Sequence, residues 1–314
     1  PAAGQVVTPA GGVFWVDLKD ATHGDITVQA CWDKLRQRHP LWNEELLQDL
    51  AQELDMQQHA DKRLNMLSAG SRRKVMVLAA LASGAARVPM AKLQLSPILP
   101  EPGKIICLGL NYFDHAKEGG RDKPEYPWFF LRSASSLLAP HAKAIRPKVS
   151  ERLDYEAELA VVIGKTVKHA TMDNALDAVF GYSCFNDISV RDYQKKTPQW
   201  TIGKNFDQTG GFGPVLVSAD ELPPGATDLR IQSRLNGQIM QDANTRDMIW
   251  GVAETITLLT ECLTLEPGDL IIMGTPAGVG QARTPPVWMK HGDTIEIEIE
   301  HIGLLHNTIQ DEAA

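Results

Sequence analysis

Short apolar runs, rich in β-branched residues, recur through the last two thirds of the chain and are separated by Gly, Pro and Asp. Such runs predict β-strands, because branched side chains pack well on a pleated sheet and the bounding residues favour turns. The predicted strands are residues 104–110, 158–164, 213–218, 229–237, 269–274 and 293–303. Helical spacing occurs there in only two stretches, 171–181 and 248–263. Many strands with few helices favour a mixed β-sandwich roll over a doubly wound parallel sheet, so the predicted class is α+β, mostly β.

The beginning of the chain shows a different pattern. Apolar residues at helical spacing predict helices over residues 44–54 and 72–84, the second of which ends at a glycine. Residues 13–18 read as a short strand. This region has no Asp/Glu/His cluster with ligand spacing, which favours a role in packing, in an interface or as a cover for the rest of the chain.

A proline-rich stretch, residues 96–104, separates the two patterns and is typical of a linker. We therefore predict a smaller N-terminal α/β accessory domain at residues 1–98 and a larger domain at residues 99–314. A chain of this length has enough residues for a substantial core in the larger domain.

The composition places the chain among soluble globular proteins, with 43% apolar and 22% charged residues. A net charge of −8 argues against nucleic-acid binding, which requires a basic face. No apolar run approaches the roughly 20 residues that cross a bilayer. No secretory signal pattern opens the sequence, so we expect a cytoplasmic protein without membrane contact. The four scattered cysteines form no Cys-x-x-Cys pair, which disfavours a zinc site and a disulfide framework.

Three acidic residues stand at the ends of predicted strands. Glu156 and Glu158 precede the apolar run of residues 160–163. Because alternate residues of a strand face the same side, their carboxylates are expected to project side by side. Asp187 follows the apolar run of residues 182–185, where a strand again gives way to a loop. Adjacent carboxylates near a buried strand repel each other and need compensation.

Two kinds of partner can supply that compensation. Three carboxylates suit a hard divalent cation such as Mg²⁺ or Mn²⁺, with positions left for water and substrate. Alternatively, Arg152, Lys165 or Arg191 neutralises them in surface ion pairs. The spacing alone leaves both interpretations open.

Six segments of the larger domain are similar, in order and spacing, to motifs of the fumarylacetoacetate hydrolase family. They read KIICLGLNYFDHAKE, DYEAELAVVIGK, FGYSCFNDISVRDYQ, WTIGKNFD, GPVLV and LIIMGTPAGVG. The resemblance covers residues 102–310 and implies a mixed β-sandwich roll as a catalytic domain, one Mg²⁺ or Mn²⁺ ion per chain and a homodimer. It also implies that Glu156, Glu158 and Asp187 are the metal ligands.

The resemblance extends to further site residues. His115 and Glu118 match the His-x-x-Glu pair of smaller family members, and a spacing of three places both on one face of a helical turn. There the carboxylate can orient the imidazole and raise its basicity. The resemblance implies that Gln194 orients water or substrate and that Lys204 stabilises an enolate or carboxylate oxygen. Thr275 resembles the threonine that binds a substrate carboxylate.

Two features depart from the family pattern. Family members often have Phe-x-Lys-x-x-x-Ser where this chain has FFLRSASS, so Arg132 replaces the lysine and is expected to bind substrate. The loop between Gln194 and Trp200 is short, and substrate-reading side chains commonly lie there. Both departures leave the substrate less defined than the metal site.

The resemblance implies an enzyme acting on ketonic C–C bonds, in which the metal chelates adjacent oxygens of a 2-oxo acid and makes an enolate tolerable. We favour hydrolysis of an acylpyruvate or related β-diketo acid, with His115 and Glu118 activating the water. The alternative is a decarboxylase or isomerase of a 2-oxo diacid in aromatic-compound catabolism. A non-catalytic metal-binding scaffold is disfavoured because His115, Glu118, Lys204 and Thr275 are all present.

Overall fold

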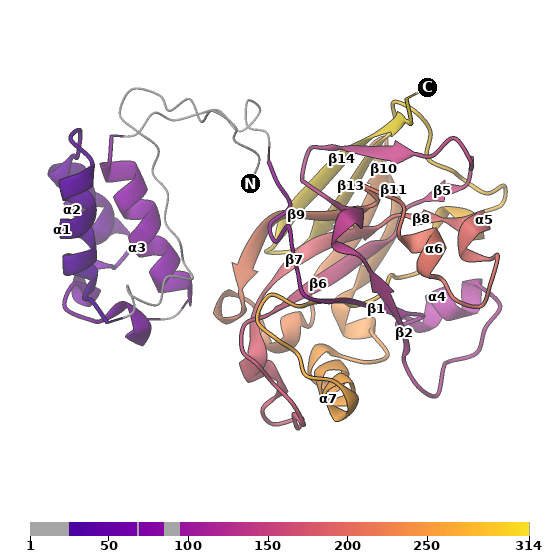
Figure 1. Ribbon diagram of the computed structural model, residues 1–314, viewed down its shortest axis with the longest axis horizontal. Coiled ribbons are helices and arrows are strands. Elements are labelled where there is room, and N and C mark those ends of the chain that lie inside the picture. Colours follow the sequence, from indigo (N-terminus) through magenta and orange to yellow (C-terminus); the bar gives the residue numbers. More distant parts are fainter. Residues whose placement is uncertain (1–24, 68, 85–94, 314) are drawn as a thin grey trace. The chain divides into compact units, whose positions relative to one another are not determined.

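The computed structural model describes residues 25–67, 69–84 and 95–313 (Figure 1). The chain divides into two compact units, Pro1–Gln94 and Leu95–Ala314. Each unit has its own apolar core. We therefore describe them separately.

The described part of the N-terminal unit is built from α1 (Val28–Arg38), α2 (Glu44–Glu53) and α3 (Ala69–Ala82). The last two confirm the helices predicted from the spacing of apolar residues. The helix α1 was not predicted. Thr27 caps its N-terminus. Its residue Trp32 donates a hydrogen bond of 3.1 Å to the carbonyl of Val75 on α3. The strand predicted at residues 13–18 lies outside the described residues.

The larger unit contains a mixed seven-stranded sheet in the order β2-β1-β12-β6-β7-β9-β3. Its strands are β1 (Ile105–Gly109), β2 (Trp128–Arg132), β3 (Leu137–Leu138), β6 (Ala157–Ile163), β7 (Val179–Asp187), β9 (Gly210–Ser218) and β12 (Leu270–Ile272). Every residue of β6 is buried, as its continuous apolar run requires, because both faces of this central strand are covered. The strand pairs antiparallel with β12 on one side and with β7 on the other.

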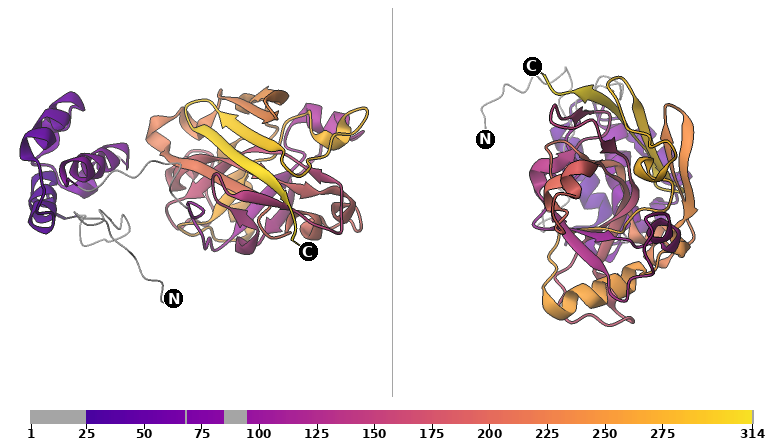
Figure 2. Two further views of the ribbon diagram at one scale, coloured as in Figure 1. Left: turned by 90° about the horizontal axis from the view of Figure 1, so that it is seen from above. Right: turned by 90° about the vertical axis from the view of Figure 1, so that its right-hand side faces the viewer.

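A second sheet of five strands packs on the first, in the order β11-β10-β13-β14-β4. Its strands are β4 (Lys143–Arg146), β10 (Arg230–Leu235), β11 (Gln238–Asn244), β13 (Thr294–Ile299) and β14 (Gly303–Asp311). In Figure 2 the yellow strands β13 and β14 lie over the larger sheet, and β14 contacts β7 and β9. The alternating burial of β13 turns Ile295, Ile297 and Ile299 into the core between the sheets. This two-sheet arrangement confirms the predicted β-sandwich class, and all six predicted strands are present.

Helices are few in the larger unit. The predicted helix at 248–263 is confirmed as α7 (Val252–Cys262). The predicted helix at 171–181 is wrong: residues Ala175–Ala178 form one 3₁₀ turn, and Val179 already pairs with Ile163 at the start of β7. Pairing within the sheet overrides the local helical spacing there.

Three short helices gather on one side of the larger unit, on the right in Figure 1. They are α4 (Phe113–Glu118), α5 (Arg191–Gln194) and α6 (Thr201–Lys204). Helix α6 contacts α5, β2 and the strand β8 (Ser189–Val190), which itself pairs with β5 (Leu153–Asp154). No helix among the described residues is long and apolar enough to span a bilayer. All four cysteines are free, and Cys107 and Cys184 are buried as their apolar surroundings predict.

Candidate active site

The acidic cluster of Glu156, Glu158 and Asp187 lies where β6 begins and β7 ends. The antiparallel register places Ala157 opposite Asn186, and the backbone N–H of Asp187 donates to the carbonyl of Glu156 at 3.0 Å. The register therefore brings together residues that are about thirty positions apart in the sequence. One carboxylate oxygen from each of the three residues lies within 4.8 Å of the others. Their exposed fractions are 4%, 1% and 0%, so the cluster is buried.

Two cations that line a cavity, Lys204 and Arg191, partly neutralise the acidic cluster, and a third, Arg132, pairs with Asp187 without lining that cavity. The Lys204 ammonium donates to Glu156 at 2.5 Å and to Asp187 at 2.7 Å, and the Arg191 guanidinium lies 2.7 Å from Glu156. Burial alone would raise the pKa of Glu156, but the charges of Arg191 and Lys204 outweigh it and lower this pKa to about 2. Burial also works against the charged form of Lys204, yet the charges of Asp187 and Glu156 raise its pKa above the ordinary value.

Glu158 has no such partner. Its carboxylate accepts a hydrogen bond of 2.6 Å from the backbone N–H of Gly274, and within the described residues no cation forms an ion pair with it. Burial, and then the negative charges of Asp187 and Glu156, raise the pKa of Glu158 well above its usual value. One carboxylate of the cluster is therefore left uncompensated.

These contacts bear on the two interpretations of the carboxylates. Arg191 does pair with Glu156, although the pair is buried and not on the surface. Arg152 and Lys165 form no ion pair with the cluster among the described residues. Three buried carboxylates with one left uncompensated fit a hard divalent cation, so Glu156, Glu158 and Asp187 could hold such an ion.

A close approach between two short helices brings the cationic side chains to the cluster. Arg191 and Gln194 lie on α5, and Lys204 lies on α6. A Cβ atom on Gly203 would lie 2.3 Å from the backbone nitrogen of Gln194, so any larger residue at position 203 would push the helices apart. Arg191 donates to the side-chain oxygen of Gln194 at 3.0 Å and to Asp154 at 2.8 Å.

The His–Glu dyad of His115 and Glu118 lies on α4. The Nδ1 atom of His115 is 2.7 Å from Glu118 Oε1, and Glu118 Oε2 accepts the backbone N–H of Gly278 at 2.8 Å. A carboxylate only accepts hydrogen bonds, so in the neutral imidazole Nδ1 carries the proton and Nε2 presents its lone pair. The side chains are 12% and 20% exposed, so solvent reaches this dyad.

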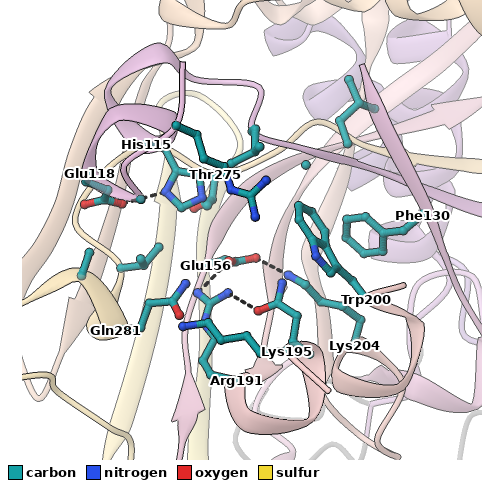
Figure 3. Close-up of a pocket in the computed structure, with 18 of the residues that line it drawn as sticks. His115, Glu118, Phe130, Glu156, Arg191, Lys195, Trp200, Lys204, Thr275 and Gln281 are labelled. Atoms are coloured by element: carbon teal, nitrogen blue, oxygen red, sulfur yellow. Dashed lines mark hydrogen bonds and ion pairs between the residues drawn. The ribbon is translucent and has the colours of Figure 1, made fainter. Parts of the chain in front are cut away.

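The dyad and two residues of the acidic cluster, Glu156 and Glu158, line one cavity of about 320 Å³, whereas the third, Asp187, is not among the lining residues. In Figure 3, His115 and Glu118 lie on one side, Lys204 lies on the other, and Glu156 lies between them. The predicted site residues that line the cavity are His115, Glu118, Glu156, Glu158, Gln194, Lys204 and Thr275. Thr275 accepts a hydrogen bond of 2.7 Å from Gln241, which fixes the orientation of its hydroxyl group.

Arg132, which the sequence predicted to bind substrate, does not line the cavity. Its side chain is fully buried and forms an ion pair with Asp187. It also donates to Thr209 at 2.8 Å and to Ser136 at 3.2 Å. These contacts favour a role in holding Asp187 over contact with substrate.

Further residues line the cavity without having been predicted as site residues, among them Arg121, Phe130, Arg191, Lys195, Trp200 and Gln281. The sequence offered a signal for Arg191, because it lies three residues before Gln194 and so shares a face of the same helical turn. Asp154 also escaped prediction. Its buried carboxylate accepts the backbone N–H groups of Gly280 at 2.7 Å and of Gln281 at 3.0 Å as well as the guanidinium of Arg191.

Fold and site together define a two-sheet β-sandwich with a buried acidic centre of metal-binding type. A comparison with protein families matches residues 104–310 to the fumarylacetoacetate (FAA) hydrolase C-terminal domain. The chain belongs to the fumarylacetoacetate hydrolase family, whose members are enzymes that act on small molecules and depend on metal. The predicted family is thus confirmed.

Individual relatives agree with this family. The chain is 42% identical over 225 residues to an oxaloacetate tautomerase of Bacillus subtilis, which covers 70% of this chain and 74% of the relative. It is 37% identical over 248 residues to a mitochondrial oxaloacetate tautomerase of Bos taurus, covering 78% and 79%. The solved structure of a fumarylacetoacetate hydrolase from Exiguobacterium antarcticum matches with a TM-score of 0.65 and 37% identity, covering 73% of this chain and 82% of that one.

Proposed function

We propose that the cavity interconverts the enol and keto forms of a 2-oxo acid with the help of a divalent cation, Mg²⁺ or Mn²⁺. The observation that carries the proposal is one cavity with a histidine base on one side, Lys204 on the opposite side, and Glu156 and Glu158 of the buried acidic cluster in its wall. Tautomerisation needs a base at the carbon beside the carbonyl and positive charge at the carbonyl oxygen, and the two sides supply these separately. The names of the relatives from Bacillus subtilis and Bos taurus support this reaction class.

Each site residue has its own role in this proposed reaction. His115 Nε2 takes a proton from C3, the carbon next to the 2-oxo group, and returns a proton in the reverse reaction, while Glu118 holds the imidazole. The Lys204 ammonium stabilises the negative oxygen that develops as C3 loses its proton, and this oxygen takes a proton from solvent water to form the enol and returns it in the reverse reaction. We assign Gln194 and Thr275 to the substrate carboxylate. A cation held by Glu156, Glu158 and Asp187 would, when bound, withdraw electron density from the 2-oxo oxygen and acidify C3.

Hydrolysis of an acylpyruvate, predicted above from the sequence, is the second candidate. The same geometry supports it, because His115 Nε2 could take a proton from a water molecule in place of a C–H proton. Decarboxylation of a 2-oxo diacid would use the same cation and ammonium to stabilise the enolate. The relatives' names favour tautomerisation, and we rank it first.

Two assays distinguish the candidates. Tautomerisation is followed as the decay of the ultraviolet absorbance of enol-oxaloacetate, and hydrolysis as the formation of pyruvate from acetylpyruvate, each with Mn²⁺ and with EDTA. We expect Mn²⁺-dependent decay of the enol and a fall in kcat of about 10²- to 10⁴-fold in His115→Gln, the usual contribution of a general base. The exposed His301 provides the control variant, His301→Gln. Pyruvate formation without enol decay would favour the second candidate, and unchanged enol decay in His115→Gln would exclude the assigned base.

The homodimer and the single cation per chain are proposals of the same kind. Light scattering coupled to size-exclusion chromatography measures the first, and elemental analysis after dialysis against Mn²⁺ measures the second. A monomer, or a metal content well away from one ion per chain, would contradict them.

A further inference from the structure

Three aromatic rings lie in contact with one another between Arg121 and Lys204, and two of them, Phe130 and Trp200, line the cavity. Trp128 and Trp200 have ring centroids 5.5 Å apart, and Trp200 and Phe130 have centroids 5.7 Å apart. We call Trp128, Trp200 and Phe130 the aromatic ladder. Each end of the ladder carries a cation: the Arg121 guanidinium carbon lies 4.9 Å from the Trp128 centroid, and Lys204 Nζ lies 5.1 Å from the Phe130 centroid. Figure 3 shows Trp200 and Phe130 side by side next to Lys204.

The fold fixes the position of the aromatic ladder. Trp128 and Phe130 are alternate residues of β2 and therefore project from the same face of the strand. Trp200 immediately precedes α6 and covers Gly109, the last residue of β1. A Cβ atom on Gly109 would lie 2.2 Å from the Trp200 ring, so only glycine lets the indole lie this close to the sheet.

Arg121 makes a backbone hydrogen bond as well as its ring contact. Its backbone N–H donates to the carbonyl of Ala116 at 2.9 Å, which ties Arg121 to the helix that carries the His–Glu dyad. A guanidinium stacked on an indole keeps its hydrogen-bond donors in the ring plane free for a ligand. Arg121 is also one of the residues that line the cavity.

Some of the cationic side chains that line the cavity form ion pairs with acidic side chains, and others do not. Lys204 and Arg191 pair with acidic side chains. Across the described parts of the chain, Arg121 forms no ion pair, and neither does Lys195, which also lines the cavity. In the proposed function the 2-oxo acid end binds to Gln194, Thr275 and the cation that the acidic cluster would hold, so the charge of Arg121 is available for a second anionic group. A 2-oxo acid with a neutral tail would leave that charge without a partner.

We propose that Arg121, mounted on the aromatic ladder, selects substrates that carry a second carboxylate at the end remote from the 2-oxo acid group. The inference rests on the proposed function, since it takes the 2-oxo acid end to be bound beside Lys204. Arg121 is chosen over Lys195 because its guanidinium lies over the ring of Trp128. The site then recognises the two ends of a diacid separately, the 2-oxo acid end beside Lys204 and the second carboxylate at Arg121.

The test compares two substrates of equal chain length that differ only at the far end. Oxaloacetate carries a distal carboxylate, and 2-oxobutanoate carries a methyl group there. We expect Arg121→Gln to raise KM for oxaloacetate by about tenfold to about 100-fold, the range for a lost charged hydrogen bond, with kcat within about twofold. Deuterium incorporation at C3 of 2-oxobutanoate should not change. Arg121→Lys, which keeps the charge, should recover part of the loss.

Lys117 provides the matched control, because it is an exposed cation on the same segment and does not line the cavity. Lys117→Gln removes the same charge and should leave both substrates unaffected. Equal losses for the two substrates in Arg121→Gln, or no loss for oxaloacetate, would overturn the proposal.

A binding measurement separates failure of this inference from failure of the proposed function. Titration calorimetry with the Mn²⁺-loaded protein gives the ratio of the two dissociation constants whether or not either compound turns over. Wild type should bind oxaloacetate more tightly than 2-oxobutanoate, and Arg121→Gln should lose most of that preference. Absence of turnover with this preference intact would count against the tautomerase alone, whereas a wild-type protein without the preference would overturn the role of Arg121.

Discussion

The two sides of the cavity are built differently. The acidic cluster lies on adjacent strands of the central sheet, is almost fully buried, and is bound by side chains from other elements. The His–Glu dyad lies on a helix of six residues, is partly exposed, and is tied to the rest of the site by the hydrogen bond that the backbone N–H of Gly278 donates to Glu118. The acidic cluster is therefore part of the buried core of the larger unit, whereas the dyad lies at its partly exposed periphery.

This difference has an energetic consequence. A change in the acidic cluster alters buried charges, so it should affect stability, cation binding and turnover together. A change in the dyad leaves the buried charges in place and should affect turnover alone. Variants on the two sides can break or sharpen this comparison.

Glu158→Gln should have the largest effect. The uncompensated carboxylate of Glu158 is the ligand that a dication would compensate most, so the variant should lose Mn²⁺-dependent activity down to the level of the EDTA-treated protein. In wild type, Mn²⁺ at about 100 times its Kd should stabilise the fold by roughly 2.7 kcal/mol. Thermal unfolding of the variant should show no such gain. Its metal-free Tm should equal or exceed that of wild type, because a costly buried acid is gone.

Glu296 on β13 gives the control for this experiment, since it is a half-buried glutamate outside the cavity. Glu296→Gln should keep the full response to Mn²⁺. An undiminished Mn²⁺ shift of Tm in Glu158→Gln would show that the cation binds elsewhere.

Lys204→Met should have the next largest effect and should appear in both measurements. The variant keeps the apolar stem but removes an ammonium that donates to Glu156 and to Asp187. We expect kcat/KM to fall by about 10²-fold or more, and the free energy of unfolding to fall by about 1.5 to 3 kcal/mol. Lys165→Met, at an exposed lysine, should change neither. A loss of turnover with unchanged stability would mean that the buried ion pairs contribute less than the comparison requires.

Glu118→Gln should have a smaller effect, confined to turnover. The amide keeps an oxygen that can accept from His115 Nδ1 but loses the charge that stabilises the protonated imidazole, so we expect kcat to fall by about tenfold with the Mn²⁺ response intact. The losses in Glu118→Gln and His115→Gln should not add in the double variant, because the two residues act as one unit. Additive losses would separate them.

The same contrast explains which features the sequence could predict. The strand β6 and the acidic cluster follow from local signals: a continuous apolar run, two glutamates with a spacing of two, and an aspartate after a second run. The helix α1 was also accessible, since Val28, Cys31, Trp32 and Leu35 repeat at helical spacing behind Thr27. It was missed because polar residues dominate the rest of the segment.

Contacts between distant segments were not accessible in this way. Arg132 meets Asp187 across 55 positions, and nothing near either residue in the sequence indicates that the arginine turns inward. The aromatic ladder likewise requires Trp200 to come back over Gly109 from a different part of the chain. Such contacts depend on the tertiary fold, so a local pattern can suggest a residue's chemistry without showing what it touches.

The last and smallest expected effect concerns pH. It tests whether a proton and the divalent cation compete for the carboxylate of Glu158. Burial and the charges of Asp187 and Glu156 raise the pKa of Glu158 above its usual value of 4.5. A raised pKa in the folded state stabilises the metal-free protein fully below about 4.5, and this stabilisation is lost as the pH rises through the folded-state pKa. A cation needs the ionised carboxylate, so its affinity should grow over the same range, by at most about tenfold per pH unit.

Thermal unfolding of wild type between about pH 5 and about pH 7.5, with and without Mn²⁺, measures both trends. We expect the contribution of Glu158 to metal-free stability to fall with rising pH and the Mn²⁺-induced shift of Tm to increase. Glu158→Gln serves as the reference, because subtracting its pH profile removes the titration of every other group. The trend comes from Glu158, so the Mn²⁺ shift of His115→Gln should still increase with pH. A shift in wild type that is independent of pH would mean that Glu158 is already ionised in the metal-free protein, and the contrast between a strained acidic cluster and a relaxed dyad would fail.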